Sequence, residues 1–147
     1  RLHPSTMEVL LAISVGRSGT PRGRWRRRQI DLKTQALLPI TNVARWAALS
    51  VGATALGTQE RLRAAAGSPV LTAEDAETLG DVFEIVQRTR LRHQLAQLES
   101  GATPSDTMRP RDLSSIEASV LDEAIREIVA IQRRMANLAR FVPALQG

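Results

Sequence analysis

The sequence predicts an all-α protein, an antiparallel bundle of four to five helices, two of them long. Apolar residues recur at intervals of three and four over most of residues 39–138. No segment shows the apolar–polar alternation that is typical of strands. Serine, threonine, glycine and proline stand between the periodic segments, where helices begin and end. A helical bundle follows from these observations.

The first expected elements are a lead-in helix over residues 5–15 and an arginine-rich loop over residues 16–30. Ser5 or Thr6 can cap the helix, and the loop contains three glycines and one proline. Residues 1–30 are therefore either the end of a preceding domain or a divergent entry to a helical domain over residues 31–147.

Two short helical segments are predicted next. Lys33–Leu38 is a turn of helix or the approach to one, and Pro39 begins a helix to about Val51. Proline suits the first position because its missing N–H would go unbonded there. Thr58 is the expected N-cap of a helix to about Ala66, which a glycine and a proline end.

The two long helices have the strongest patterns. The segment Thr72–Asp75 resembles a capping box and opens a helix over residues 73–99, which Gly101 ends. Ser114–Glu117 is a better capping box, and the apolar period behind it reaches Leu138. The apolar stripe of this last helix predicts its core positions: Ile116, Val120, Leu121, Ala124, Ile128, Ile131, Met135 and Leu138.

Length and composition indicate one globular domain. The chain has 147 residues, is 43% hydrophobic and contains no cysteine, which excludes disulfides and thiolate metal sites. Its two histidines are far apart in sequence, so no metal site is expected. No apolar run approaches the length of about 18 residues that a membrane span needs, and we expect a cytoplasmic protein without a membrane partner.

The net charge of +5 is a local property of the loop before residue 30. All of the 20 basic residues except Lys33 are arginine, and most of the excess lies between Arg17 and Arg28. The cluster Arg24–Arg28 reads as a solvated loop or an arm that docks on an acidic neighbour. Nucleic acid is an unfavoured partner, because aromatic residues for stacking are only 3% of the chain.

A polar turn interrupts the first long helix. Its apolar stripe runs through Ala76, Leu79, Phe83 and Val86, and the next steps fall on Arg90 and Gln94. A charge and an amide on such a stripe are unfavourable unless they are paired or used. Either Arg90 pairs with a buried acid such as Glu117 or Glu123, or Arg90 meets an anionic ligand together with Arg92 or His93.

Catalytic motifs are not apparent. Gly16–Gly19 lacks the lysine of a phosphate-binding loop. Asp75 and Glu77 resemble a magnesium-binding carboxylate pair, but they fall in the first turn of a predicted helix, where acids favour the helix dipole. We therefore expect no catalytic residue and no metal ligand in this chain.

The order and spacing of several short blocks nevertheless resemble a known family. The first and third blocks are the most specific: Asp31-Leu32-Lys33 with Leu38-Pro39-Ile40 and Ala44-Arg45, and Leu71 with Ala76, Leu79, Phe83 and Arg90-Leu91-Arg92-His93-Gln94. The other blocks are Thr58 with Arg61-Leu62, and Gly101, Pro110, Leu113-Ser114, Glu117, Leu121 and Gln132. Over about residues 30–141 the chain is similar to the nucleotidyltransferase substrate-binding domain. Ala118 stands where members usually have arginine.

In that family the domain is the C-terminal part of bacterial signal-transduction proteins, after cyclic-nucleotide-binding, CBS and uridylyltransferase-like nucleotidyltransferase domains. The resemblance implies a bundle that packs beside the catalytic domain of the parent protein and holds its substrate. It implies no cofactor in this chain, and Mg²⁺ with a nucleoside triphosphate in the parent's catalytic domain. By matching position, the substrate-binding candidates are Lys33, Arg45, Arg61, Arg90, Arg92, His93 and Gln94.

Three functions remain open at this point. The first is an accessory substrate-binding domain, which is not catalytic by itself and takes an acidic or protein substrate; a pocket lined by Arg90 and Gln94 would favour it. The second is a helical protein-interaction or dimerisation module without a small-molecule site, favoured by an exposed apolar stripe near Val129 and Ile131. The third is nucleic-acid binding through the arginine loop.

Overall fold

The computed structural model describes the backbone of residues 29–141 and the side chains of residues 29–138. The predicted helical bundle is confirmed, with α3 (Leu38–Ser50), α4 (Thr58–Ala65) and the two 27-residue helices α5 (Ala73–Glu99) and α6 (Ser115–Phe141). The predicted lead-in helix, the loop Gly16–Gly19 and the arginine cluster lie outside the described residues.

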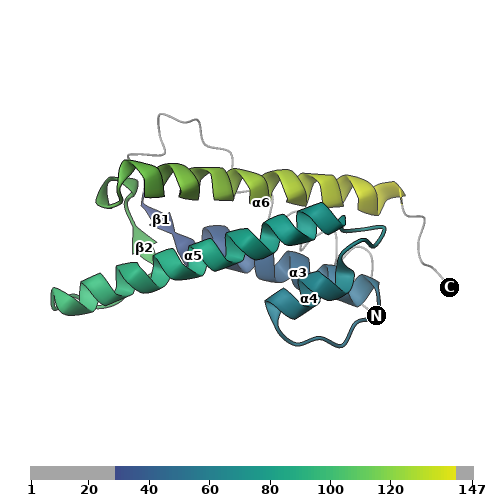
Figure 1. The fold of residues 1–147 in the computed structure, drawn as a ribbon, viewed down its shortest axis with the longest axis horizontal. Helices are drawn as coiled ribbons and strands as arrows, with labels where there is room; N and C mark the ends of the chain where they lie inside the picture. Colours follow the sequence, from purple (N-terminus) through teal and green to yellow (C-terminus); the bar gives the residue numbers. More distant parts are fainter. Residues whose placement is uncertain (1–28, 142–147) are drawn as a thin grey trace.

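Helices α5 and α6 form the long axis of the molecule and run in opposite directions (Figure 1). Helix α3 lies behind α5 in Figure 1, and α4 packs against both α3 and the first half of α5. The last turns of α5 project beyond the rest of the bundle (Figure 1). None of the described helices is both long and apolar enough to cross a membrane.

The first helix begins earlier than the sequence predicted. A π-helical turn over Lys33–Leu37 leads directly into α3, so the expected start at Pro39 was wrong and the expected turn before it is confirmed. Asp31 explains the early start, since its Oδ1 accepts the backbone N–H groups of Lys33 and Thr34 at 3.0 and 3.1 Å. That cap bonds two N–H groups that otherwise lack a helical partner.

Two short strands were not predicted. β1 (Ile30–Asp31) pairs antiparallel with β2 (Thr107–Met108), and Ile30 lies opposite Met108. Both of these side chains are buried in the core. Two-residue strands are too short to show an alternating pattern, so only the tertiary structure reveals them.

The caps predicted for the two long helices are confirmed. Thr72 Oγ1 accepts the N–H of Asp75 at 3.1 Å, and Ser114 and Glu117 form both bonds of a capping box at 3.2 Å. Gly101, with φ +77°, ends α5, and the N–H of Ala102 bonds the carbonyl of Gln97 at 2.8 Å. The cap predicted for α4 was wrong by one residue, because Thr58 is its first helical residue and Gly57 precedes it.

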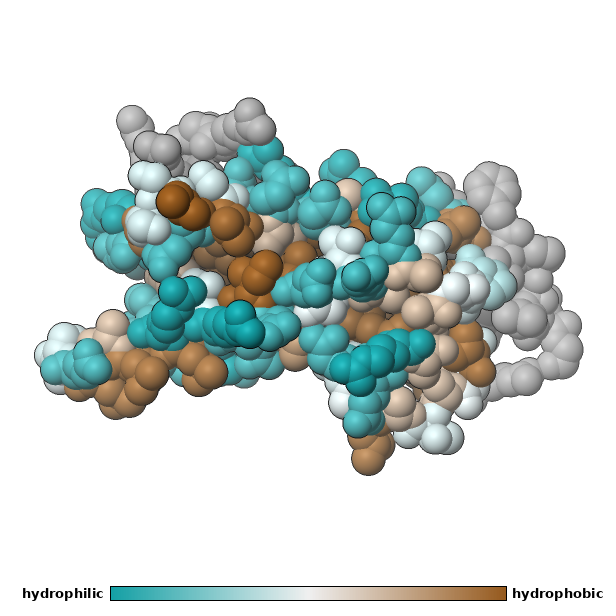
Figure 2. Space-filling model, viewed as in Figure 1, coloured by the Kyte–Doolittle hydropathy of each residue, from teal (hydrophilic) through white to brown (hydrophobic). Residues whose placement is uncertain are grey.

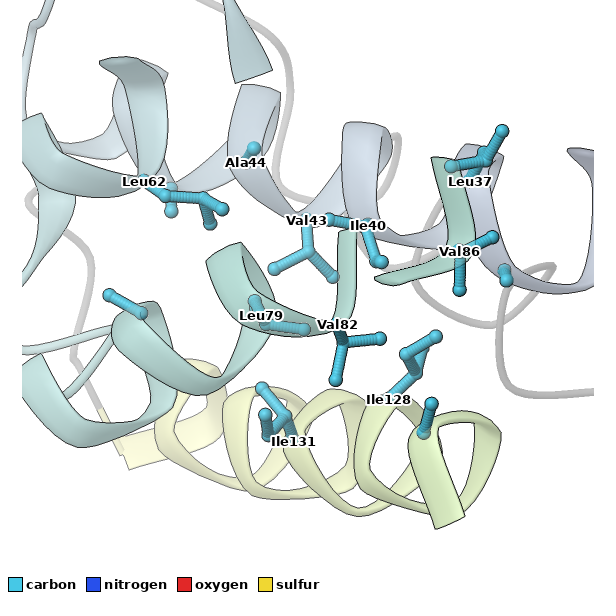
Figure 3. Packing of buried hydrophobic residues seen from close by; sticks show 14 of the residues in the cluster. Leu37, Ile40, Val43, Ala44, Leu62, Leu79, Val82, Val86, Ile128 and Ile131 are labelled. Atoms are coloured by element: carbon cyan, nitrogen blue, oxygen red, sulfur yellow. The ribbon is translucent and has the colours of Figure 1, made fainter. Parts of the chain in front are cut away.

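One hydrophobic core joins all four helices. Leu79 of α5 lies among Val43 of α3, Leu62 of α4 and Ile131 of α6 (Figure 3). The predicted stripe of α6 is confirmed at five positions that are fully or almost fully buried: Leu121, Ala124, Ile128, Ile131 and Met135. It fails at Ile116, Val120 and Leu138, which are 77%, 42% and 36% exposed. Ile116 and Val120 share a ridge that lies one residue off the buried face, so they point away from the core.

Gln132 is an exception within this core. Its side chain is fully buried, and neither Nε2 nor Oε1 has a hydrogen-bond partner among the described residues. Burying an amide without hydrogen bonds opposes folding.

The first prediction follows from this amide. Replacing Gln132 by leucine is expected to stabilise the fold by about 1–2 kcal/mol, because it removes two unsatisfied polar atoms and keeps most of the volume. Urea unfolding of the two proteins measures the difference. A variant less stable than the parent would mean that the amide has a partner outside the described residues.

Candidate functional site

The predicted polar turn of α5 surrounds Asp106. The Oδ1 atom of Asp106 accepts hydrogen bonds from Nε of Arg90 and from Nε2 of Gln94, the latter at 3.0 Å. The backbone carbonyl of Asp106 accepts the N–H of Leu32 at 3.0 Å. Asp106 therefore bonds the segment before β2 to α5 through its side chain and to Leu32, the residue after β1, through its backbone.

His93 and Gln97 extend this attachment along the same segment. His93 Nε2 lies 3.0 Å from the carbonyl oxygen of Thr107. The amide of Gln97 donates to Ser105 Oγ at 3.1 Å and accepts the Ser105 N–H at 2.8 Å. Residues on successive turns of α5 thus hold residues 105–107 in place.

Arg92 makes a different contact. Its guanidinium lies 3.2 Å from Oε1 of Glu117, at the start of α6. The two side chains are 65% and 39% exposed, so this surface ion pair contributes little to stability. The contact links the exposed side of α5 to α6.

The other predicted binding residues do not join this turn. Lys33 is exposed at the start of the π-helical turn, and Arg45 is exposed on α3. Arg61 of α4 donates from Nε to the carbonyl of Ala55 at 2.9 Å and so holds the α3–α4 loop. The seven candidates are therefore distributed over several parts of the bundle.

Arg90 has its charge partner within the fold. Arg90 pairs with an acid, as one of the two interpretations expected, but the acid is Asp106 rather than Glu117 or Glu123. The side chains of Arg90 and Asp106 are 32% and 21% exposed. In the described structure the polar turn thus attaches a loop, while the ligand-binding role of its residues stays a prediction.

A concave site lies elsewhere, between α4 and the first half of α5. This α4–α5 groove has a volume of about 670 Å³. Its polar lining comes from both helices: Gln59 and Arg63 of α4, and Glu77, Asp81, Glu84 and Gln87 of α5. None of the seven predicted binding residues lines it.

Gly80 allows the two helices to approach at the groove. The backbone carbonyl of Gly80 accepts a hydrogen bond from Nε2 of Gln59 at 2.9 Å. A Cβ at this position would meet Oε1 of Gln59 at 2.8 Å, too close for an unchanged side chain. A glycine inside a long helical pattern is the sequence signal that could have located this groove, since it often marks a close approach.

The charge of the groove is negative. Glu77, Asp81 and Glu84 recur at intervals of four and three, so one face of α5 presents three carboxylates. Arg63 is the single cationic side chain in the lining of the groove, while Arg88 of α5, just outside the lining, forms an ion pair with Glu84. The groove therefore favours positively charged groups and disfavours phosphates.

Asp75, the first acid of the pair that resembles a magnesium site, binds Arg134 within the fold. Its two oxygens accept hydrogen bonds from Nε and Nη2 of Arg134 at 3.1 and 2.8 Å, which joins α5 to α6. The hydrogen bond with Asp75 raises the pKa of Arg134 above its ordinary value. Among residues 29–138, no group of three or more His, Asp or Glu side chains is arranged to hold a metal ion.

Comparison with known proteins identifies the family. The model of a family described as "putative nucleotidyltransferase substrate binding domain" matches residues 12–138, which is most of the chain. The chain therefore belongs to this family. Searches of curated proteins and of solved structures found no match.

Proposed function

We propose that this chain is an accessory substrate-binding domain of a nucleotidyltransferase and is not catalytic by itself. In this proposal it packs beside the catalytic domain of its parent protein, which supplies the nucleoside triphosphate and Mg²⁺. The engagement of Asp75 with Arg134 supports the non-catalytic role, since that carboxylate is already committed to holding two helices together. The family resemblance further supports a cytoplasmic, bacterial signal-transduction parent with CBS or cyclic-nucleotide-binding domains.

The α4–α5 groove carries the proposal. It is concave, about 670 Å³ in volume, and its wall combines apolar surface from Phe83 with several polar side chains. Small-molecule sites in proteins have volumes of this size, and the polar half of this lining suits a charged ligand. We assign the acceptor substrate, the molecule that receives the nucleotidyl group, to this groove.

The charges of the lining indicate the class of acceptor. The groove is lined by three carboxylates and one guanidinium, and Arg88 at its edge pairs with Glu84, which leaves a smaller negative excess. A triphosphate would therefore be repelled and an ammonium group attracted. The acceptor is therefore a polar molecule or a peptide segment that carries positive charges. The nucleotide binds outside this groove, on the catalytic domain.

Calorimetry with spermine, a flexible molecule with several ammonium groups, tests this assignment. The triple variant Glu77→Gln, Asp81→Asn, Glu84→Gln is expected to bind spermine at least tenfold more weakly than the parent chain at low salt. Glu123→Gln is the matched control, because Glu123 is an exposed acid of α6 outside the groove. Equal binding by the triple variant and the control would contradict the assignment.

The seven residues predicted from the family pattern remain a separate proposal for nucleotide contacts. Arg92 is the most suitable of them for a test. Its ion pair with Glu117 is exposed, so removal of the Arg92 side chain should leave the fold intact. Titration of ATP or UTP with Mg²⁺ into the chain and into Arg92→Gln measures this contact. Weaker binding by the variant would support it, and unchanged binding would remove Arg92 from the candidates.

A second candidate function, a protein-interaction module, has its own observation. The stripe expected near Val129 and Ile131 does not provide it, since Ile131 is fully buried. Three exposed leucines on the projecting end of α5 favour it instead.

A further inference from the structure

The projecting end of α5 carries an apolar stripe that no described element covers. Leu91, Leu95 and Leu98 are 56%, 56% and 58% exposed. Their spacing of four and three places them on one face of the helix, next to the face from which Arg90 and Gln94 hold Asp106. Figure 2 shows hydrophobic surface along this end of the molecule. Water-exposed leucines in a row are typical of an interaction surface.

We propose that this stripe binds a second copy of the chain. The α5 helices of the two copies pack antiparallel, and the two-fold axis passes beside Leu95, so that Leu95 meets its counterpart. A two-fold contact of this kind uses the same surface on both copies. In it, Leu91 of each copy packs near Leu98 of the other.

Charges beside the stripe favour this arrangement. Arg92 and Glu99 lie on the same flank, since seven residues correspond to nearly two helical turns. At a rise of about 1.5 Å per residue, Arg92 lies ~4.5 Å before Leu95 and Glu99 lies ~6 Å after it. Antiparallel packing therefore brings Glu99 of each copy next to Arg92 of the other, in two equivalent ion pairs.

The side chains of Arg92 and Glu99 can both reach a partner copy. Arg92 is 65% exposed although it also contacts Glu117, and Glu99 forms no ion pair within residues 29–138. A parallel two-fold pairing would instead place Arg92 and Glu99 of the two copies on opposite sides of the interface, so these ion pairs would not form. The charge pattern thus selects the antiparallel dimer.

The size of the surface sets the expected affinity. Two helix faces of this length bury on the order of 1,000 Å² in total, near the lower limit for specific interfaces. We therefore expect a dissociation constant on the order of 10–100 µM. The dimer leaves the α4–α5 groove open, since the groove uses the other half of α5, so the two proposals fail or succeed separately.

Analytical ultracentrifugation of the 147-residue chain over about 5–300 µM tests the proposal. The chain is expected to associate to dimers, and Leu95→Glu to stay monomeric because two carboxylates would face each other at the axis. Leu56→Glu is the control, since Leu56 is 83% exposed in the α3–α4 loop, and it should dimerise like the parent. A monomeric parent chain would overturn the proposal, as would a dimer that survives Leu95→Glu.

A cross-link tests the geometry directly. The chain has no cysteine, so a single Leu95→Cys variant should form a covalent dimer under mild oxidation, because the two copies meet at this residue. Leu56→Cys, treated in the same way, should give far less. Equal cross-linking of both variants would show random collision and contradict the proposed axis.

A charge variant tests the orientation. Glu99→Arg should weaken the dimer at least fivefold, since each ion pair becomes a pair of arginines. Glu123→Arg changes charge equally at an exposed site on α6 and should leave dimerisation unchanged. Equal weakening by both variants would indicate net charge rather than the antiparallel contact.

Discussion

Replacement of Leu79 by alanine is expected to destabilise the fold by about 3–4 kcal/mol. Leu79 is fully buried, and residues from three other helices surround it (Figure 3). Its neighbours belong to different helices and cannot all close the resulting cavity. The thermal midpoint should fall by roughly 10 °C, which calorimetry or circular dichroism measures.

The matched control for this prediction is Leu56→Ala. Leu56 is 83% exposed, so the same chemical change should alter stability by less than about 0.5 kcal/mol. A Leu79→Ala variant that unfolds at the same temperature as the control would contradict the packing of α5 against its neighbours.

Loss of the Asp106 carboxylate has the second largest expected effect. Asp106→Ala should destabilise the fold by about 2–3 kcal/mol, because it removes a charged acceptor from Arg90 and Gln94 and leaves a half-buried guanidinium without its partner. Hydrogen exchange should also accelerate in residues 105–108, which depend on this attachment.

A double-mutant cycle with Arg90→Ala separates the ion pair from the rest of the effect. The coupling between Arg90 and Asp106 should exceed about 1 kcal/mol, whereas coupling between Arg88 and Glu84 should stay below about 0.5 kcal/mol. The second pair is the natural reference, since its side chains are 70% and 56% exposed. Equal coupling in both pairs would mean that the polar turn does not hold the loop.

Much of the fold could be predicted because its determinants are local. The capping box at Ser114–Glu117, the cap at Thr72 and Gly101 all act within a few residues, and the structure confirms each of them. The apolar period of α6 is similarly visible from Leu121 to Met135. Short-range patterns of this kind determine where helices begin and end and which helix face packs in the core.

The candidate site depended on contacts that are remote in sequence. The sequence identified Arg90 and Gln94 as a polar spot on an apolar stripe, but Asp106 belongs to a loop without any pattern of its own. The α4–α5 groove requires two helices to be placed together, and only Gly80 signalled their close approach. Pairing across such distances is decided by tertiary packing, which local periodicity does not encode.

Nuclear magnetic resonance mapping of spermine on the ¹⁵N-labelled chain would locate the proposed acceptor site in the α4–α5 groove. We expect amide shift changes at Gln59 and Arg63 and along residues 77–87 of α5. Shift changes confined to residues 90–94, or spread evenly over the acidic surface, would contradict the groove as the binding site.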